Sequence, residues 1–407
     1  MPKQTCVIIG ASHAAVQLAL SLRQGGWQGR ILIVGEEQVL PYQRPPLSKD
    51  VLAGSKSLEM IPIRPAAVFE KSNIEFLSGR RVVHIDRVNK RLQLHDDTSL
   101  AYDKLALTLG SRVRKIPLTG SEQEGVFYLR TIADVEQIRP FVVDGKRAVI
   151  VGGGYIGLEA AAVLRKQAME VTVIEALPRV LQRVTAPQVS AFYQRIHAEE
   201  GVRIQTGTGV ASIAGSGRAE HVVCMDGSEH LADLVIIAAG ILPNTELAEE
   251  AGLRTDNGIL VDEFTRSSDP DIVAAGDCTR HFNPFYQRKI RLESVQNATD
   301  QAKTAAATLN GQLLPYNTLP WFWSEQYDTR LQIAGLSETY DNSVIRGNPE
   351  EGRSFAMFYF KGDRMLAVDA INRPAEFMMG KRLLIEGADI DKKKLGDERV
   401  SPKDLLQ

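Results

Sequence analysis

VIVGGGYIGLEAAA, residues 149–162, runs from an apolar strand through a glycine-rich turn into a helix, and Gly152, Gly154 and Gly157 fill the three glycine positions of a dinucleotide-binding turn. Such a turn lets the main chain approach a pyrophosphate, whose charge the N–H groups and dipole of the next helix stabilise. The next strand, VTVIE, ends on Glu175 at roughly the expected distance of about twenty residues. An acid there accepts from a ribose 2′-OH and repels a 2′-phosphate. The stretch predicts a dinucleotide site that favours NADH over NADPH.

A weaker copy of the pattern, VIIGASHAAVQLA, lies at residues 7–19. Gly10 is present, but Ser12 and Ala15 stand where the second and third glycines would be, and the strand that follows ends before Glu36. A single degenerate copy is equally typical of a plain strand-to-helix packing turn. Two copies, each with its own acid, indicate a protein that holds two dinucleotides against each other.

The overall composition agrees with an enzyme of two or three domains. The chain has 407 residues and a formal net charge of -2, which gives no general attraction to nucleic acid. No stretch approaches the roughly 18 uncharged apolar residues of a membrane span, and the N-terminus leads directly into a strand, so we expect a cytoplasmic protein. The cysteines Cys6, Cys224 and Cys278 are scattered, which favours neither a disulfide framework nor a metal site.

Strands alternate with helical patterns after both glycine turns, which predicts parallel sheets covered by helices. The two turns are too far apart for a solenoid repeat and are spaced as two similar domains. After Pro243 we expect a pair of strands that ends at Gly276–Asp277, then a long helix from about Ser294 to Asn310. Pro315 and Pro320 mark a boundary, beyond which period-two runs predict a small antiparallel sheet with terminal helices.

Several further segments carry a resemblance over essentially the whole length: PYQRPPLSKDVL at 41–52, YLRT at 128–131, AAGILPN at 238–244, DPDIVAAGDC at 269–278, ESVQNATDQA at 293–302 and PWFWSEQ at 320–326. In order and spacing the chain resembles the FAD-dependent, NADH-linked ferredoxin reductases of bacterial cytochrome P450 and ring-hydroxylating dioxygenase systems. The resemblance implies an α/β fold with two Rossmann-like dinucleotide-binding domains, glutathione-reductase-like, plus a C-terminal α+β domain. The implied ranges are 1–110 and 242–318 for FAD, 111–241 for NADH and 319–407 for an interface domain.

The resemblance also implies three catalytic residues. Lys49 would lie beside the flavin, Glu159 would meet both Lys49 and the nicotinamide carboxamide, and Trp323 would pack beside the flavin. Hydride transfer from a nicotinamide to a flavin depends on such positioning. Taken by themselves, the lysine is equally typical of a solvated loop, the glutamate of helix-dipole compensation and the tryptophan of a buried core.

The binding residues expected from the turns and the resemblance form two sets. For FAD they are Gly10, Ser12, Ala14, Ala15, Glu36, Arg44, Lys49, Val82, Arg130, Asp277 and Val295. For NADH they are Gly152, Gly154, Tyr155, Ile156, Gly157, Glu159, Glu175 and Gly240. Asp277 would hold the FAD ribityl chain, although it follows a strand where an N-capping residue of a helix is also typical. Ordinary core packing equally explains the two valines, and a surface charge explains Arg130.

The positions of the cysteines limit which electron acceptor the flavin can have. Disulfide reductases of the same architecture need two nearby cysteines facing the flavin, whereas residues 1–110 here contain only Cys6, in an opening strand where burial would keep it inert. Electrons would therefore leave the flavin directly for a one-electron carrier. We expect a [2Fe-2S] ferredoxin that feeds a cytochrome P450 or another oxygenase, with transient electrostatic docking to a reductase monomer. Arg280, Arg288, Lys289 and Arg291 are candidates for the docking surface, although charge runs are typical of any solvated face.

Three alternatives share these motifs. A rubredoxin reductase would differ only in its docking surface. An NADH-sensing interaction protein like apoptosis-inducing factor would use reduction to change its assembly. A plain NADH oxidase would pass its electrons to oxygen.

Overall fold

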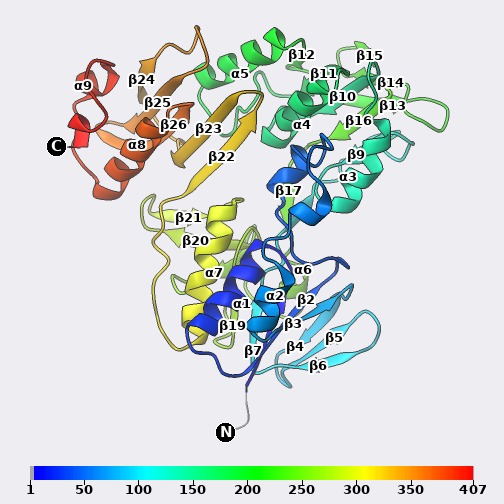
Figure 1. Cartoon of the computed structure of the whole chain (residues 1–407), viewed down its shortest axis with the longest axis vertical. Helices are drawn as coiled ribbons and strands as arrows, with labels where there is room; N and C mark the ends of the chain where they lie inside the picture. Colours follow the sequence, from blue (N-terminus) through cyan, green and yellow to red (C-terminus); the bar gives the residue numbers. More distant parts are fainter. Residues whose placement is uncertain (1–3, 407) are drawn as a thin grey trace. The chain divides into compact units, whose positions relative to one another are not determined.

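The computed structural model describes residues 4–406 (Figure 1). It divides into two compact units. The first unit holds the chain up to Gln43, Glu59–Arg112 and Ile241–Pro320; the second holds Arg44–Leu58, Val113–Gly240 and the chain from Trp321 onward. The segment Arg44–Leu58 thus belongs to the second unit, although the range expected for the FAD domain includes it. The finer division into three domains stays a prediction.

A five-stranded parallel sheet forms the centre of the first unit, in the order β19-β7-β1-β2-β3. Its strands are β1 (Thr5–Ile9), β2 (Arg30–Gly35), β3 (Ile74–Ser78), β7 (Lys104–Leu107) and β19 (Ile272–Ala274). The sequence TCVII of β1 is apolar on both faces: Cys6 and Ile8 enter one hydrophobic cluster, while Val7 and Ile9 enter another. A strand buried on both sides must lie between two covering layers.

The helices α1 (His13–Gln24) and α7 (Val295–Leu309) pack against each other and share a cluster with one face of this sheet (Figure 1). The other face packs on a three-stranded antiparallel sheet, β4 (Val82–Asp86), β5 (Arg91–Leu94) and β6 (Ser99–Ala101), and on α6 (Glu246–Glu250). Further elements are α2 (Ala66–Lys71) and a mixed sheet of β18 (Ile259–Val261), β20 (Thr279–Asn283) and β21 (Arg288–Ile290). A short pair, β8 (Ser111–Val113) and β17 (Ile241–Pro243), completes this part of the chain.

The second unit repeats this plan. Its parallel sheet has the order β12-β11-β10-β16-β9. The strands are β9 (Val126–Tyr128), β10 (Arg147–Val151), β11 (Glu170–Glu175), β12 (Arg203–Thr206) and β16 (Leu234–Ile237), and the helices are α3 (Ile132–Ile138), α4 (Tyr155–Lys166) and α5 (Pro187–Glu199). One sheet face packs on the antiparallel strands β13 (Val210–Ala214), β14 (His221–Cys224) and β15 (Glu229–Leu231).

The end of the chain adds a five-stranded antiparallel sheet in the order β22-β23-β26-β25-β24. Its elements are β22 (Trp321–Gln326), β23 (Thr329–Gly335), β24 (Asn342–Gly347), β25 (Phe355–Lys361) and β26 (Arg364–Ile371), followed by α8 (Pro374–Glu386) and α9 (Lys392–Gly396). The helix α8 packs on β23 and β26. The remaining elements are short 3-10 turns: η1 (Pro45–Ser48), η2 (Leu58–Met60), η3 (Arg139–Phe141) and η4 (Asp404–Leu406).

The expected α/β class with a C-terminal α+β part is confirmed, as is the helix that begins after Ser294, whose hydroxyl accepts from the Asn297 N–H. The two strands expected before Asp277 are present, but they do not pair with each other, because β18 pairs with β20 whereas β19 joins the large parallel sheet beside β7. Within residues 4–406, no helix combines the length and the apolar character needed to cross a bilayer.

Candidate functional site

The glycine turn before α4 has the geometry of a phosphate-binding loop. Gly152 has φ of 114°, and a Cβ atom there would meet the Ala238 carbonyl oxygen at 2.5 Å. A Cβ on Gly157 would meet the Gly152 oxygen at 2.1 Å, which keeps the helix close to the turn. Around Gly154, by contrast, no described atom lies within 4 Å of an added Cβ. The helix begins with no side-chain cap and no acid in its first turn. Its first N–H groups therefore fit an added diphosphate.

Glu175 ends β11 as expected, and its carboxylate braces the turn. Its Oε2 accepts from the Gly153 N–H at 2.7 Å and its Oε1 accepts from the Leu177 N–H at 2.8 Å. A carboxylate offers about four acceptor sites, so two remain for a ribose hydroxyl. Of the other expected NADH residues, Tyr155 opens α4, Ile156 is exposed, and Gly240 has φ of 93° with open space beside it.

The turn before α1 in the first unit is built in a similar way. Gly10 has φ of 102°, and an added Cβ would lie 2.2 Å from the Thr108 carbonyl oxygen. Ser12 stands at the N-cap without a side-chain cap bond, and the first turn again contains no acid. Ala14 and Ala15 are buried, and Glu36 lies directly after β2 with an exposed side chain. These N–H groups fit a second diphosphate.

The contact between Lys49 and Glu159 that the resemblance implies is present in the second unit. Lys49 Nζ lies 2.6 Å from Glu159 Oε2, and the Glu159 side chain is nearly fully buried. Lys49 is therefore not a solvated loop residue, and Glu159, in the second turn of α4, does more than offset the helix dipole. Ser48 also donates to Glu159 Oε2 at 2.6 Å, and Ser324 donates to Oε1 at 2.7 Å.

Trp323 lies on β22, half-buried, with its ring 5.5 Å from that of Trp321 on the same strand face. The ring of Phe322, on the opposite face, lies 4.8 Å from that of Tyr155. This contact joins β22 to the start of α4 within the second unit. The strand therefore brings Ser324 to Glu159 while Trp323 points the other way.

The structure excludes helix N-capping, the alternative role that the sequence left open for Asp277. It follows β19 as expected, but the next element is the strand β20, so it caps no helix. Its Oδ2 accepts from the Ser111 hydroxyl at 2.7 Å within the first unit. A carboxylate can accept several hydrogen bonds at once, which suits the expected contact with a sugar-alcohol hydroxyl.

The other expected FAD residues lie in both units. In the first unit, Val82 is buried at the start of β4 and Val295 is the first residue of α7. In the second unit, Arg44 donates to the Arg130 carbonyl oxygen at 2.9 Å, and the Arg130 N–H donates to Asp134.

The three cysteines are buried and unpaired with one another. Burial raises the pKa of Cys6 to about 12 and that of Cys278 to about 12, and it also raises the pKa of Cys224. A thiol reacts as its thiolate. These cysteines therefore remain protonated thiols at neutral pH, as expected for Cys6.

Sequence reasoning missed Ser48 and Ser324, the two hydroxyl donors to Glu159. Both lie inside quoted motifs, next to Lys49 and Trp323. That adjacency was the available signal.

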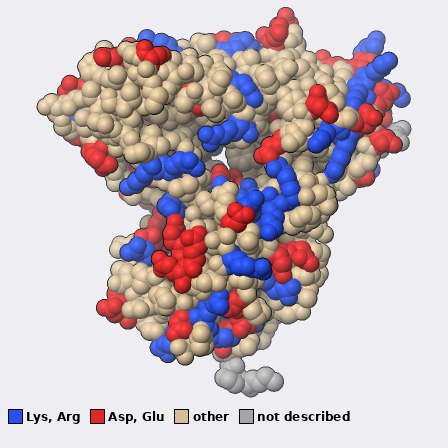
Figure 2. All heavy atoms as spheres, turned by 180° about the vertical axis from the view of Figure 1, so that it is seen from behind, with Lys and Arg blue, Asp and Glu red and all other residues tan. Residues whose placement is uncertain are grey.

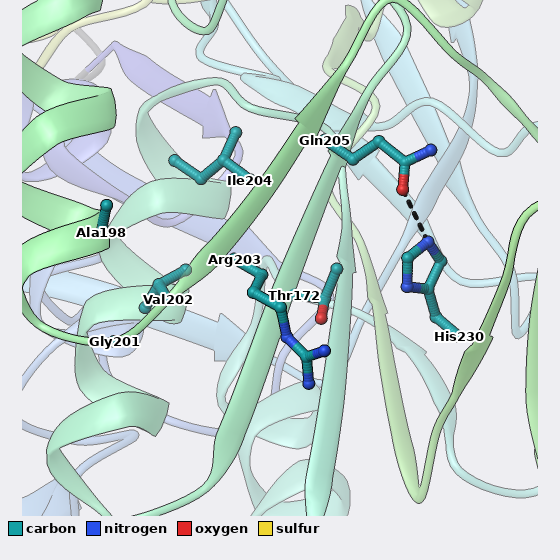
Figure 3. A pocket seen from close by; sticks show the side chains of 8 residues that line it. All are labelled: Thr172, Ala198, Gly201, Val202, Arg203, Ile204, Gln205 and His230. Carbon is teal, nitrogen blue, oxygen red and sulfur yellow. Dashed lines mark hydrogen bonds between the residues drawn. The ribbon is translucent and has the colours of Figure 1, made fainter.

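A cavity of about 490 Å³ lies elsewhere in the second unit, along the edge strand β12 (Figure 3). Thr172, Arg203, Gln205 and His230 are among its lining residues, and His230 Nε2 is 2.7 Å from Gln205 Oε1. None of the expected site residues lines it. It therefore has no part in the site described here.

The basic residues after Asp277 are partly neutralised. Arg280 pairs with Asp256, and Arg291 Nη1 lies 2.5 Å from Glu293 Oε1. Arg288 and Lys289 are exposed on β21. Figure 2 shows basic and acidic side chains interspersed on the face it displays.

Two family models match the chain: "Pyridine nucleotide-disulphide oxidoreductase" over residues 4–302 and "Reductase C-terminal" over residues 321–406. The chain therefore belongs to the pyridine nucleotide-disulphide oxidoreductase family, whose members and relatives here imply FAD and NAD(H) as cofactors. The N–H groups at the starts of α1 and α4 fit the diphosphates of such a pair.

Among its relatives, the chain is 43% identical over 406 residues to putidaredoxin reductase CamA of Pseudomonas putida, covering 98% of this chain and 96% of that protein. It is 42% identical to rhodocoxin reductase of Rhodococcus erythropolis, covering 93% and 88%. Rubredoxin-NAD(+) reductase of Pseudomonas putida is 38% identical, covering 90% and 96%.

Two solved structures of reductases have the same fold over nearly the whole chain. The covalent putidaredoxin reductase–putidaredoxin complex contains a chain with a TM-score of 0.97 and 42% identity, covering 100% of this chain and 99% of that one. A ferredoxin reductase for the CYP199A2 system of Rhodopseudomonas palustris gives a TM-score of 0.95 at 40% identity, covering 98% and 99%.

Proposed function

We propose that this chain is an FAD-dependent NADH:ferredoxin oxidoreductase that passes electrons from NADH to a [2Fe-2S] ferredoxin of a cytochrome P450 or dioxygenase system. The observation that carries the proposal is the ion pair at 2.6 Å between Lys49 and the buried Glu159, which lies two residues beyond the last glycine of the intact turn. Relatives named as ferredoxin reductases, and a solved complex of one with its ferredoxin, support the choice of partner. We place this activity in the cytoplasm, in a monomer.

Each residue has a separate part in this mechanism. The α4 turn would bind the NADH diphosphate through its N–H groups, and Glu175 would accept from the ribose hydroxyl. The α1 turn, Glu36 and Asp277 would hold FAD along its length. Glu159 would orient the nicotinamide carboxamide, Lys49 would support the flavin ring, and Trp323 would exclude water. When bound, FAD accepts a hydride from NADH and releases its electrons singly.

The buried cysteines are unsuited to accept electrons from the flavin. Since their raised pKa values keep Cys6 and Cys278 protonated, they do not act as thiolate redox partners of the flavin. The thiols therefore provide no internal acceptor, which supports an acceptor outside the chain. Arg288 and Lys289 are exposed and remain candidates to meet its acidic surface.

The test is NADH-driven reduction of cytochrome c with and without added [2Fe-2S] ferredoxin, alongside oxygen consumption and a parallel assay with rubredoxin. We expect reduction that depends on the ferredoxin and exceeds both other routes. Faster transfer to rubredoxin would favour a rubredoxin reductase. Oxygen consumption unaffected by either carrier would favour an oxidase, and slow transfer to every carrier with NADH-dependent dimerisation would favour a sensing protein.

Replacing Glu159 with glutamine tests its role. The change keeps the shape but removes the charge beside Lys49, so we expect the KM for NADH to rise roughly tenfold, the effect of losing a charged hydrogen bond. The flavin absorbance per protein should stay constant. An unchanged KM would remove Glu159 from the nicotinamide site.

A further inference from the structure

A continuous line of buried hydrogen bonds leads away from Glu159 within the second unit. Ser324 Oγ donates to Glu159 Oε1 at 2.7 Å, and Gln326 Nε2 donates to Ser324 Oγ at 3.2 Å. Gln326 Oε1 lies 2.9 Å from His197 Nε2, and His197 Nδ1 lies 2.9 Å from the Tyr327 hydroxyl. Ser324, Gln326 and His197 are all essentially inaccessible to solvent.

The carboxylate fixes the direction of every bond in this line. Glu159, paired with Lys49, can only accept, so the single hydroxyl hydrogen of Ser324 points to it. The Ser324 oxygen must then accept from an N–H, which places the amide nitrogen of Gln326 on that side. With the amide reversed, Ser324 would need a second hydrogen that it does not have. The Gln326 oxygen therefore faces His197.

The same reasoning assigns the tautomer of His197. An amide oxygen can only accept, so the Nε2 atom of His197 must carry a hydrogen and donate to Gln326. Burial lowers the pKa of His197 to about 4, against the opposing effects of Gln326 and the nearby Glu200 carboxylate, so the ring is neutral at pH 7. Its Nδ1 atom then has a lone pair and accepts from the Tyr327 hydroxyl. Every donor in the line points toward Glu159.

We infer that Ser324, Gln326 and His197 are positioning residues for Glu159: they hold its carboxylate in one orientation for the nicotinamide through a one-way chain of donors. This inference rests on the proposed role of Glu159. The three residues come from β22 and α5, elements separate in sequence from the glycine turn. The C-terminal sheet is thereby part of the NADH site, because it supplies the donor to Oε1.

The acceptor sites of the Glu159 carboxylate show the effect of this line of hydrogen bonds. A carboxylate has about four, and Ser48, Lys49 and Ser324 occupy three of them. Two of these donors share Oε2, so the site that remains is on Oε1. Loss of the Ser324 hydroxyl removes the donor to Oε1, so that only the two donors to Oε2 still hold the carboxylate.

The first experiment reads the tautomer directly, without turnover. Nitrogen NMR of the FAD-loaded protein with isotope-labelled histidine gives signals from the seven histidines, and the His197→Gln variant identifies the one from His197. We expect a neutral ring with hydrogen on Nε2 at neutral pH. Hydrogen on Nδ1, or a charged ring, would overturn the one-way chain.

The second experiment separates binding from turnover. Ser324→Ala should raise the KM for NADH in ferricyanide reduction roughly tenfold with little change in kcat, because Glu159 loses the donor that orients its Oε1 for the nicotinamide. Ser324→Thr keeps the hydroxyl on a strand that accepts β-branched residues, so it should restore the KM. Glu325→Ala, on the exposed face of the same strand, is the matched control and should leave the KM unchanged.

These outcomes distinguish the inference from the proposed function. An unchanged KM in Ser324→Ala, or an equal rise in Glu325→Ala, contradicts the positioning role even when Glu159→Gln raises the KM. An unchanged KM in Glu159→Gln contradicts the role of Glu159 itself. In that case the positioning role is contradicted too, whereas the NMR result still shows whether the chain has the direction inferred.

Discussion

The two glycine turns differ at two of three positions, and the difference separates what the fold requires from what a ligand requires. Gly10 and Gly152 are both dictated by the chain: each has a positive φ, and each would place a Cβ against a carbonyl oxygen of a neighbouring strand end. At the third position the turns diverge, because Gly157 touches its own turn whereas the fully buried Ala15 has room for a methyl group.

At the second position the requirement is of another kind. No described atom lies near a Cβ placed on Gly154, so the second unit gives no steric reason for glycine there. Close approach of a diphosphate does give one. The first turn has Ser12 at this point, which shows that the same backbone form accommodates a side chain. The comparison thus predicts that Gly154 serves the ligand, whereas Gly152 and Gly157 are required by the fold.

The largest expected effect follows from Gly157→Ala. Its Cβ would lie 2.1 Å from the Gly152 oxygen, so the helix must shift, at a cost of about 1–3 kcal/mol in the free energy of unfolding. The matched change in the other turn, Ala15→Gly, should cost about 1 kcal/mol or less through backbone entropy. Denaturant unfolding of the two variants measures both, and equal losses would contradict the difference in helix packing.

Gly154→Ser should leave folding intact and weaken NADH binding. The serine suits an N-cap, so the melting temperature should stay constant or rise slightly. The Kd for NADH should rise roughly tenfold, because the side chain occupies the space for the diphosphate. Ser12→Gly is the control in the first turn and should not change NADH binding. Unchanged NADH affinity in Gly154→Ser would mean that this glycine does not serve the ligand.

Glu175 and Glu36, the acids that follow the two turns, should differ in their effect on nucleotide preference. Glu175→Gln should reduce the preference for NADH over NADPH several-fold, since the charge that repels a 2′-phosphate is lost. Glu36→Gln, after the first turn, should leave that ratio unchanged and affect only FAD retention. Ratios of kcat/KM for the two nucleotides measure the effect. A ratio that changes equally in both variants would contradict the assignment of the second turn to NADH.

An effect that depends on pH concerns a buried carboxyl in the second unit. Burial raises the pKa of Asp369 to about 7, although Tyr359 donates to its Oδ2 at 2.5 Å, and its Oδ1 has no partner among the described residues. The folded state binds this proton more tightly than the unfolded state, so the associated stability is complete below the unfolded pKa and is lost as the pH rises through about 7. His281 in the first unit has the opposite sign: burial lowers its pKa to about 4, so stability is lost as the pH falls below its usual value.

Asp369→Asn keeps the side chain neutral at every pH. Relative to the unchanged protein, it should therefore be more stable in mildly alkaline than in mildly acidic buffer. Melting temperatures over that range measure the difference. A constant difference would show that Asp369 does not titrate there.

The sequence was most informative where the backbone conformation allows only one residue type. Gly10 and Gly152 mark turns that other residues cannot form, and the apolar strands beside them predict the two parallel sheets. The Lys49–Glu159 contact was expected only from resemblance, because no local pattern relates residues more than a hundred positions apart. Ser324 escaped notice because a serine in a strand carries no chemical signal until its neighbour across space is known. The sequence left helix capping open for Asp277, because an aspartate after a strand often precedes a helix. A single residue does not show that the next element is the strand β20.

The most direct test of the central claim is anaerobic rapid mixing of the FAD-loaded protein with NADH, followed by oxidised [2Fe-2S] ferredoxin. We expect NADH to bleach the flavin absorbance and ferredoxin to restore it while becoming reduced itself. A flavin that NADH does not bleach, or one that stays bleached when ferredoxin is added, would contradict that claim.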